Sequence, residues 1–358
     1  MLKQQKIFFD FLRFCIGSAK DIPDSLKVAD WKEQYAIAKK QCLVGVLFDG
    51  IKKLPAEHVG MKKELLLQWM AESQMLEKAN VRLNDAAIQV SEWFRKKGFR
   101  TCILKGQGNA LMYPNPYSRT PGDIDIWVEG GDKRVISFVR SISPHEKACY
   151  HHIEFPSYKG VEVEVHYRPS FLLCFWHNRR LQKYYERVKE EQFSHRVKLR
   201  EQGEVAIPTA EFNLIFQLTH IYAHLMNEGI GLRQLLDYYF VLLHADIKNV
   251  VELQRNLKYI GLWKFARAIM YIMHEVFGMP ASRLIVPPNE KYGKYVLNEV
   301  LEAGNFGRHD ARNRFGRSQL GHNLQRVYRD IRLVRYFPGE ALCESLFRVW
   351  HFFWRIWH

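Results

Sequence analysis

Two aspartates separated by one residue, Asp123 and Asp125, lie at the start of the apolar run Asp-Ile-Asp-Ile-Trp-Val over residues 123–128. Because side chains alternate faces along a β-strand, the two carboxylates share one face, while Ile124 and Ile126 share the other. Adjacent carboxylates repel each other unless a cation lies between them, and Mg²⁺ prefers carboxylate oxygens together with substrate phosphates. The pattern therefore predicts a divalent-metal site at the beginning of a buried strand.

A third acid is available in the strictly alternating run Val-Glu-Val-Glu-Val-His-Tyr over residues 161–167. Glu162, Glu164 and His166 share one face of this expected strand. If it lies beside the first strand, one of the two glutamates joins the aspartates. Either pattern alone is common on solvated strands without any bound metal. Together, and after the apolar run that ends at Lys105-Gly106, they favour a carboxylate cluster for phosphoryl or nucleotidyl transfer.

These residues resemble the nucleotidyltransferase superfamily related to DNA polymerase β, most closely a bacterial branch of uncharacterised nucleotidyltransferases. The resemblance covers roughly residues 101–240, and the residues that carry it are Leu104-Lys105-Gly106, Arg119, Gly122-Asp123-Ile124-Asp125, Glu164-Val165-His166 and, more weakly, His220, His224, Arg233 and Asp237. Where the superfamily has Gly-Ser after its first strand, this chain has Gly106-Gln107. Gly108-Asn109 fits the spacing to the acids better.

The resemblance implies a site as well as a fold. Asp123, Asp125 and Glu164 are the expected catalytic residues and ligands of Mg²⁺ or Mn²⁺, with Glu164 preferred to Glu162 because the family-like Glu-x-His falls there. The expected contacts to the nucleotide are Lys105, Gly106, Gln107, Arg119, His166 and Arg233. The implied reaction transfers a nucleoside monophosphate from a nucleoside triphosphate, such as ATP, to a hydroxyl or phosphate of an unidentified acceptor. A small molecule, a protein side chain and an RNA end all remain open as acceptors.

An alternative function is a catalytically silent module that binds nucleotide or nucleic acid. It rests on the basic, glycine-punctuated segment over residues 304–335, which interleaves aromatic and basic side chains: Phe306, Arg308, Arg312, Arg314, Phe315 and Arg317. Charge and aromatic stacking bind single strands without sequence preference. A loop over the cleft that gathers phosphates fits the same segment.

Composition limits the partners without choosing among them. The 358 residues are 47% hydrophobic and carry a formal net charge of +15, which favours anionic partners. Six scattered cysteines without a C-x-x-C pair suit a reducing cytoplasm better than a disulfide framework. No secretory signal is visible, and no run reaches the roughly 18 apolar residues of a membrane span. A cytoplasmic location without a stable membrane span is expected.

The chain is expected to fold as an α+β protein in which a small mixed sheet of the polymerase-β type is flanked by helices. The expected regions are an N-terminal helical region (1–99), a nucleotidyltransferase-like core (100–208) and a C-terminal helical region (209–358). Helices are expected over residues 31–53 and 61–97, the second packing across the sheet. Beyond residue 171 the pattern is helical except for a short strand over residues 205–208, and Thr209 is expected to cap the next helix.

Three further patterns carry alternatives. His220 and His224 share a helix face, but Ile221 stands where a zinc protease has its glutamate, so packing or phosphate contact is favoured over zinc. Arg233 and Asp237 are expected to form an i,i+4 pair, either structural or at the nucleotide. His151-His152 favours structural or surface roles.

The C-terminal stretch carries an apolar stripe of helical period: Leu346, Phe347, Trp350, Phe353, Trp354 and Trp357. A stripe of this kind lies either on the protein's own helices or in a membrane interface. Docking on the helical domain is favoured, and we expect alanine at either Trp350 or Trp354 to cost stability.

Overall fold

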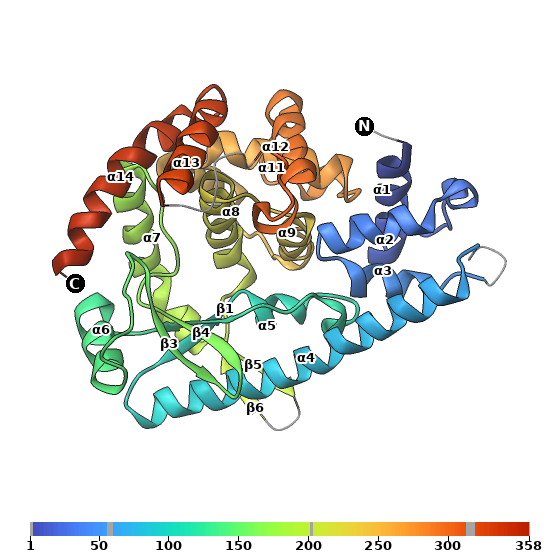
Figure 1. Ribbon diagram of the computed structural model, residues 1–358. Coiled ribbons are helices and arrows are strands. Elements are labelled where there is room, and N and C mark those ends of the chain that lie inside the picture. Colours follow the sequence, from blue (N-terminus) through green and yellow to red (C-terminus); the bar gives the residue numbers. More distant parts are fainter. Residues whose placement is uncertain (1–2, 56–59, 201–202, 313–318, 358) are drawn as a thin grey trace.

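The computed structural model describes residues 3–55, 60–200, 203–312 and 319–357. It shows a mainly helical protein built around a small mixed sheet, with helices from both ends of the chain around it, which confirms the expected α+β class (Figure 1). The N-terminal elements are α1 (Lys3–Ile16), η1 (Asp24–Val28), α2 (Trp31–Lys40), α3 (Val44–Ile51) and α4 (Lys63–Lys96).

The helix expected over residues 31–53 is in fact two helices, α2 and α3. Cys42 between them has a positive φ of 55°, so the chain turns there instead of continuing the helix. Neither glycine nor proline marks this break, and for that reason the sequence pattern gave no sign of it. The long helix α4 agrees with the expectation to within a few residues.

The central sheet contains β1 (Thr101–Leu104), β2 (Ile124–Val128), β3 (His152–Tyr158) and β4 (Val161–His166) in the order β1-β2-β4-β3. β1 and β3 are antiparallel to their neighbours, whereas β2 and β4 run parallel. The predicted adjacency of the two acid-bearing strands is confirmed, and its register places Asp125 opposite Glu164. The predicted turn over residues 158–160 closes the β3–β4 hairpin, with positive φ at Lys159 and Gly160.

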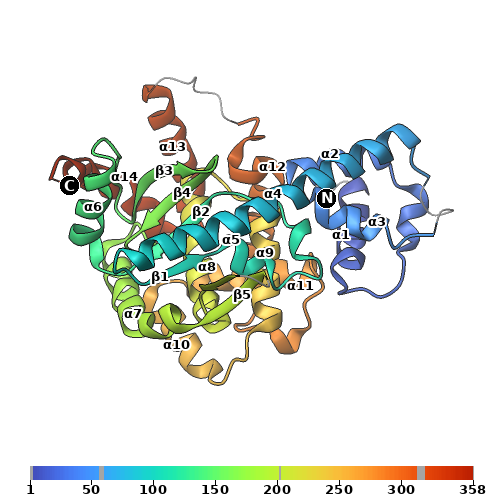
Figure 2. The same cartoon turned by 90° about the horizontal axis from the view of Figure 1, so that it is seen from below.

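Helices cover both faces of the sheet. One face, with Ile124 and Ile126, packs against α4 and α6 (Gly131–Ile142) in a single apolar cluster. Figure 2 shows α4 running across the sheet, as expected. On the other face, Trp127 stacks with Phe193 and Phe212 of the C-terminal helices. Alternation along β2 therefore turns Asp125 towards the C-terminal region.

The chain after the sheet is helical apart from one hairpin. Its elements are α7 (Phe175–Ser194), β5 (Arg196–Arg200), β6 (Gly203–Ala206), α8 (Ala210–Asn227), α9 (Leu232–His244), α10 (Val250–Ile260), α11 (Trp263–Glu275), η4 (Ala281–Arg283), α12 (Glu290–Ala303), η5 (Asn305–Gly307), α13 (Gln319–Val334) and α14 (Pro338–Trp357). The strand expected over residues 205–208 begins earlier, as β6, and pairs with β5, which we had expected to be helical. The side chain of Thr209 accepts a hydrogen bond from the backbone N–H of Phe212, which confirms the cap of α8.

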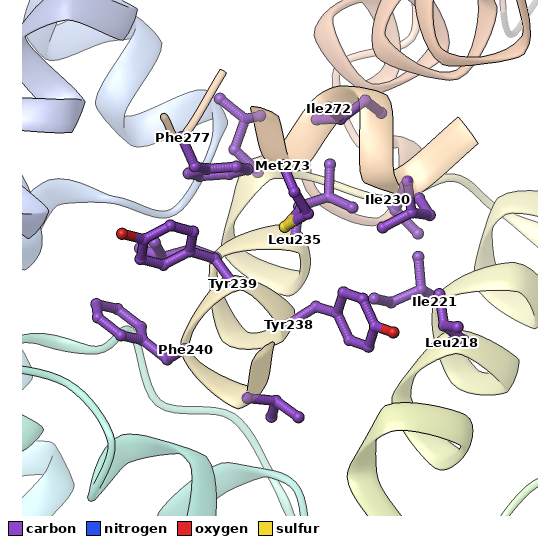
Figure 3. Close-up of a cluster of buried hydrophobic side chains, with 14 of the residues drawn as sticks. Leu218, Ile221, Ile230, Leu235, Tyr238, Tyr239, Phe240, Ile272, Met273 and Phe277 are labelled. Carbon is purple, nitrogen blue, oxygen red and sulfur yellow. The ribbon is translucent and has the colours of Figure 1, made fainter. Parts of the chain in front are cut away.

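Helix α9 lies at the centre of the largest apolar cluster. Figure 3 shows its side chains between Leu218 and Ile221 of α8 and Ile272 and Met273 of α11. The same cluster continues to the N-terminal helices through residues such as Phe11. Because α8 and α9 are buried on nearly every side, they form a rigid wall opposite the sheet.

Only part of the expected apolar stripe on α14 is buried. Phe347 and Trp354 are buried, which confirms docking for these two side chains, whereas Leu346 and Phe353 are more than half exposed. Trp350 is 37% exposed, although its ring contacts Tyr150 and Phe175. The stability cost of alanine at Trp350 or Trp354 stays a prediction, and the smaller burial of Trp350 indicates the smaller cost. Among the helices of the described residues, none combines the length and the apolar character needed to cross a membrane.

Candidate active site

The three predicted acids meet in one cavity. Asp123 directly precedes β2, Asp125 lies on it, and Glu164 is the register partner of Asp125 on β4. Oxygens of the three carboxylates lie within 4.8 Å of one another. They line a cavity of about 440 Å³ between the sheet and α8, α9 and α14. Glu164 faces this cavity, whereas Glu162 is exposed and is not among its lining residues.

Two cationic side chains contact the same oxygen of Asp125. Lys105 Nζ lies 2.8 Å from Asp125 Oδ1, and His166 Nε2 lies 2.9 Å from the same oxygen and 3.3 Å from Glu164 Oε2. Lys105 follows β1 with a φ of 51°, a rare backbone conformation for a residue with a side chain. The turn after β1 thus carries the Lys105 side chain to Asp125.

The protonation of this cluster is uneven. The charge of Asp125, followed by burial, raises the pKa of Asp123 to about 6. Burial alone would raise the pKa of Asp125, but Lys105 and His166 hold it below its ordinary value. Burial would also lower the pKa of His166, but its hydrogen bonds to Asp125 and Glu164 raise it to about 9. At neutral pH His166 is therefore protonated, and the three carboxylates outnumber the two nearby cations.

This donor set fits a divalent cation of the magnesium type. All three ligands are carboxylates, the group that Mg²⁺ and Mn²⁺ prefer. Within the described residues, Asp123 forms no ion pair, and its carboxylate faces the cavity. Excess negative charge with an accessible carboxylate is the environment that a bound cation stabilises.

A second charged pair lies on another side of the cavity. Arg119 binds Asp237 through two hydrogen bonds of 2.8 Å, and the hydroxyl of Tyr113 donates to Asp237 at 2.7 Å. The expected i,i+4 pair is therefore wrong: Asp237 pairs with Arg119 instead of Arg233. Nε and Nη2 of Arg119 each donate to a different oxygen of Asp237, so the contact is bidentate although the two residues lie far apart in sequence.

Arg233 is consequently left with few partners. One of its terminal nitrogens donates to the carbonyl of Thr120 at 3.1 Å, and its buried Nε has no hydrogen-bond partner. Burial, followed by the charge of Arg119, lowers its pKa. The guanidinium lines the cavity and lies 5.7 Å from the ring centroid of Phe306. Of the two predicted arginines, Arg233 is the one still available to an anion.

The glycine turn contributes Gly106 to the cavity, and Asn109 of the short helix α5 (Gly106–Ala110) lines it as well. Gln107 is buried and is not among the lining residues. Asn109 Oδ1 accepts a hydrogen bond of 2.8 Å from Gln217 of α8. Each candidate pair thus contributes one residue to the cavity: Gly106 from the first and Asn109 from the second.

Histidines form much of the remaining wall. His220 Nε2 lies 3.3 Å from Lys105 Nζ, and His224 pairs with Glu228 at 2.6 Å. The two residues do not form a zinc site with other described side chains. Contrary to the structural or surface reading, His151 and His152 also line the cavity, with their rings against that of His166. Their adjacency in sequence does not indicate this position, because it is the pairing of β3 with β4 that brings the two histidines to the cavity.

Another wall comes from the C-terminal region. It includes Phe306, Arg326, Glu344, Phe347, Arg348 and His351. Phe306 and Arg326 belong to the basic segment over residues 304–335, which agrees with the interpretation of that segment as a cover of the cleft, whereas the contribution of α14 was not predicted. In the basic segment, Arg312 is paired with Asp310 and Glu299, while Arg308 is exposed. Arg314, Phe315 and Arg317 lie outside the described residues.

Acidic side chains on paired strands beside a glycine turn, faced by helices, define a nucleotidyltransferase-like protein. The family model described as "Uncharacterised nucleotidyltransferase" matches residues 27–278, and the chain belongs to this family. The predicted resemblance is thereby confirmed at the level of the family. No curated protein is significantly similar to the chain.

Among solved structures, the chain is similar to an antigenic nucleotidyltransferase-like protein from Paracoccidioides brasiliensis. The sequence identity is 15% and the TM-score 0.32, and the match covers 55% of this chain and 97% of the other.

Proposed function

We propose that the protein is a metal-dependent nucleotidyltransferase that transfers a nucleoside monophosphate from a nucleoside triphosphate to an acceptor hydroxyl or phosphate. The observation that carries the proposal is the convergence of Asp123, Asp125 and Glu164 at one end of the cavity. Divalent cations held by these acids would supply charge neutralisation for the leaving pyrophosphate and activation of the attacking oxygen.

The protein's own groups have separate tasks in this proposal. Lys105 and Arg233 provide positive charge in the cavity that holds the acids, where they would contact the phosphates of the donor. His166 is held by Asp125 and Glu164, and so orients both carboxylates. Arg119 is fully engaged with Asp237 and positions the loop before β2. The acceptor then enters along the wall formed by α8, η5 and α14.

The proposal is tested by a metal-dependent shift in melting temperature with nucleoside triphosphate. Ligand that binds only the folded state raises stability by mass action. We expect Mg²⁺ or Mn²⁺ to be required for the shift, and Asp123→Asn combined with Asp125→Asn to abolish its metal-dependent part. A double variant that keeps the full shift would contradict the site.

Glu164 and Glu162 provide a matched pair of variants on one strand face. Glu164→Gln should remove the metal-dependent shift, whereas Glu162→Gln, which changes an exposed glutamate two residues away, should keep it. Incubation of the wild-type protein with each labelled ribonucleotide and cell extract then identifies the donor and the acceptor class together.

The same variants distinguish the silent binding module. Binding by charge alone weakens steeply with salt and needs neither divalent metal nor Asp123. Arg312, one of the residues on which that alternative rests, is already paired with two acids, so its charge is largely used within the fold. Salt-sensitive binding that survives the double aspartate variant would favour the silent module over the enzyme.

A further inference from the structure

A second group of metal-binding side chains lies at the junction between α7 and α14. Cys174 directly precedes α7, and His177 lies in the first turn of that helix. Glu340 lies in the first turn of α14, and Cys343 follows one turn later. The two segments thus contribute two pairs of residues at i,i+3 spacing, which places the members of each pair on one face of its element.

The ligand atoms of three of these residues converge. The sulfur of Cys174, a ring nitrogen of His177 and a carboxylate oxygen of Glu340 lie within 4.8 Å of one another. Cys174 and Glu340 are buried, and His177 and Cys343 are partly buried. Burial, together with an interaction with the Cys174 thiol, raises the pKa of Cys343, so a second sulfur lies beside one member of the group. All six cysteines of the chain are free.

Glu340 is held in place by the backbone. Its Oε2 accepts hydrogen bonds from the N–H groups of Leu173 and Cys174, at 2.6 and 3.2 Å, while Oε1 lies 3.1 Å from His177 Nδ1. A carboxylate that binds metal is normally supported by hydrogen bonds of this kind. The His177 ring lies directly against Gly261, where an added Cβ would approach ring atoms to 2.5 Å. Both side chains are therefore fixed before any ion binds.

We propose that Cys174, His177, Glu340 and Cys343 bind one structural zinc ion that joins α14 to the start of α7. Two sulfurs, one imidazole nitrogen and one carboxylate oxygen suit Zn²⁺, which takes four ligands in structural sites. On binding, each thiol loses its proton to solvent and becomes a thiolate, and the ion replaces the contact between His177 Nδ1 and Glu340 Oε1. The N-terminus of α7 stabilises the negative charge that remains on the site.

The site would fix two walls of the larger cavity. The connection between β4 and α7 lines that cavity through Pro169, Ser170, Phe171 and Leu173, and it ends at Cys174. Helix α14 lines it through residues such as Phe347 and His351, on the turns after Cys343. Zinc at the junction would hold these walls at a constant separation. The proposal is independent of nucleotidyl transfer, because none of its four residues binds the donor or the Mg²⁺ ions in the proposed function.

Zinc content measures the site directly. We expect about one zinc per chain in full-length protein purified without chelator, in line with a closed four-ligand site. Cys174→Ser combined with Cys343→Ser should lose it. Cys42→Ser is the control for thiol loss elsewhere, and Cys149→Ser tests the neighbouring group of Cys149, His151 and His152. Asp123→Asn should keep the zinc, so failure of the active-site proposal would not affect this result.

Cobalt supplies a second readout that does not depend on the folding of the double variant. Co²⁺ added to zinc-stripped wild-type protein should give a thiolate-to-cobalt charge-transfer band, and Cys343→Ser alone should weaken it. Three results would overturn the proposal: folded wild-type protein that binds neither zinc nor cobalt, zinc that is lost in Cys149→Ser but kept in the double variant, and thiol titration showing Cys174 and Cys343 joined as a disulfide.

Discussion

The cavity holds two buried charged groups built in opposite ways. At Arg119 and Asp237 one cation meets one carboxylate with bidentate geometry, and Tyr113 satisfies a further lone pair. At Asp123, Asp125 and Glu164 three carboxylates face Lys105 and His166, and Asp123 has no ion-pair partner among the described residues. The first group is balanced within the protein, whereas the second carries more negative than positive charge among the described residues. A buried ion pair whose charges balance is therefore typical of a structural role. A buried cluster with an excess of one charge is typical of a functional site.

The largest expected effect follows from breaking the balanced pair. Asp237→Ala leaves the Arg119 guanidinium buried without its partner, which should lower the free energy of unfolding by about 3–5 kcal/mol. Urea unfolding measures the loss. Asp246→Ala, at an exposed aspartate shortly after the same helix, is the control and should change the free energy by less than about 0.5 kcal/mol. Equal effects at the two positions would contradict the comparison.

Removing one charge from the cluster of Asp123, Asp125 and Glu164 should raise the free energy of unfolding instead of lowering it. The pKa of Asp123 is about 6 in the folded protein, above its ordinary value of 3.8. As pH rises between these values, the unfolded chain ionises first, so the wild-type protein loses stability. Asp123→Asn avoids this loss and should be more stable than wild type by about 1–2 kcal/mol at neutral pH without divalent metal.

The pH dependence provides the check. The stability gain of Asp123→Asn should shrink as pH falls from about 6 and disappear below about 3, where the wild-type carboxyl is protonated in both states. Thermal unfolding in chelator across this range measures it. A variant that is less stable than wild type at neutral pH would show that Asp123 is a structural residue after all.

The smallest expected effect compares two arginines of the basic segment. Arg312 lies between Asp310 and Glu299, and Arg308 is exposed. Arg312→Ala should lower the free energy of unfolding by about 1 kcal/mol, because buried Asp310 loses its ion pair with Arg312, while Glu299 keeps the one with Arg332. Arg308→Ala should leave it unchanged within about 0.5 kcal/mol. If the order is reversed, the pairing of Arg312 does not stabilise the fold.

The acid-bearing strands were predictable because a strand has a period of two. Once Asp125 and Glu164 are assigned to strands, their faces follow from the alternation, and parallel pairing brings them together. The Lys-Gly turn and the helix that packs across the sheet were visible for similar reasons: each is encoded by neighbours in sequence. The alternation left Glu162 and Glu164 open, and the family-like Glu-x-His favoured Glu164, which is the glutamate that lines the cavity.

Contacts between distant segments were not predictable in this way. The i,i+4 rule suggested Arg233 as the partner of Asp237, but Arg119, on a loop far earlier in the chain, takes that place. The rule describes exposed helices, whereas α9 is buried and packing decides which cation reaches the carboxylate. Likewise, β5 is only five residues long, and its alternation of charged and apolar residues is too short to distinguish it in the sequence from the helix before it.

The family match covers only part of the residues that line the cavity. The match ends at residue 278, so it contains all three acids, Lys105 and Arg233, but not Phe306, Phe347 or His351. The acids and both cations thus lie in the part of the chain that the family model describes, and one wall of the cavity lies beyond it. Under the proposed function, chemistry and acceptor choice would belong to different segments of the chain, because function depends on the residues of a site and not on the fold alone.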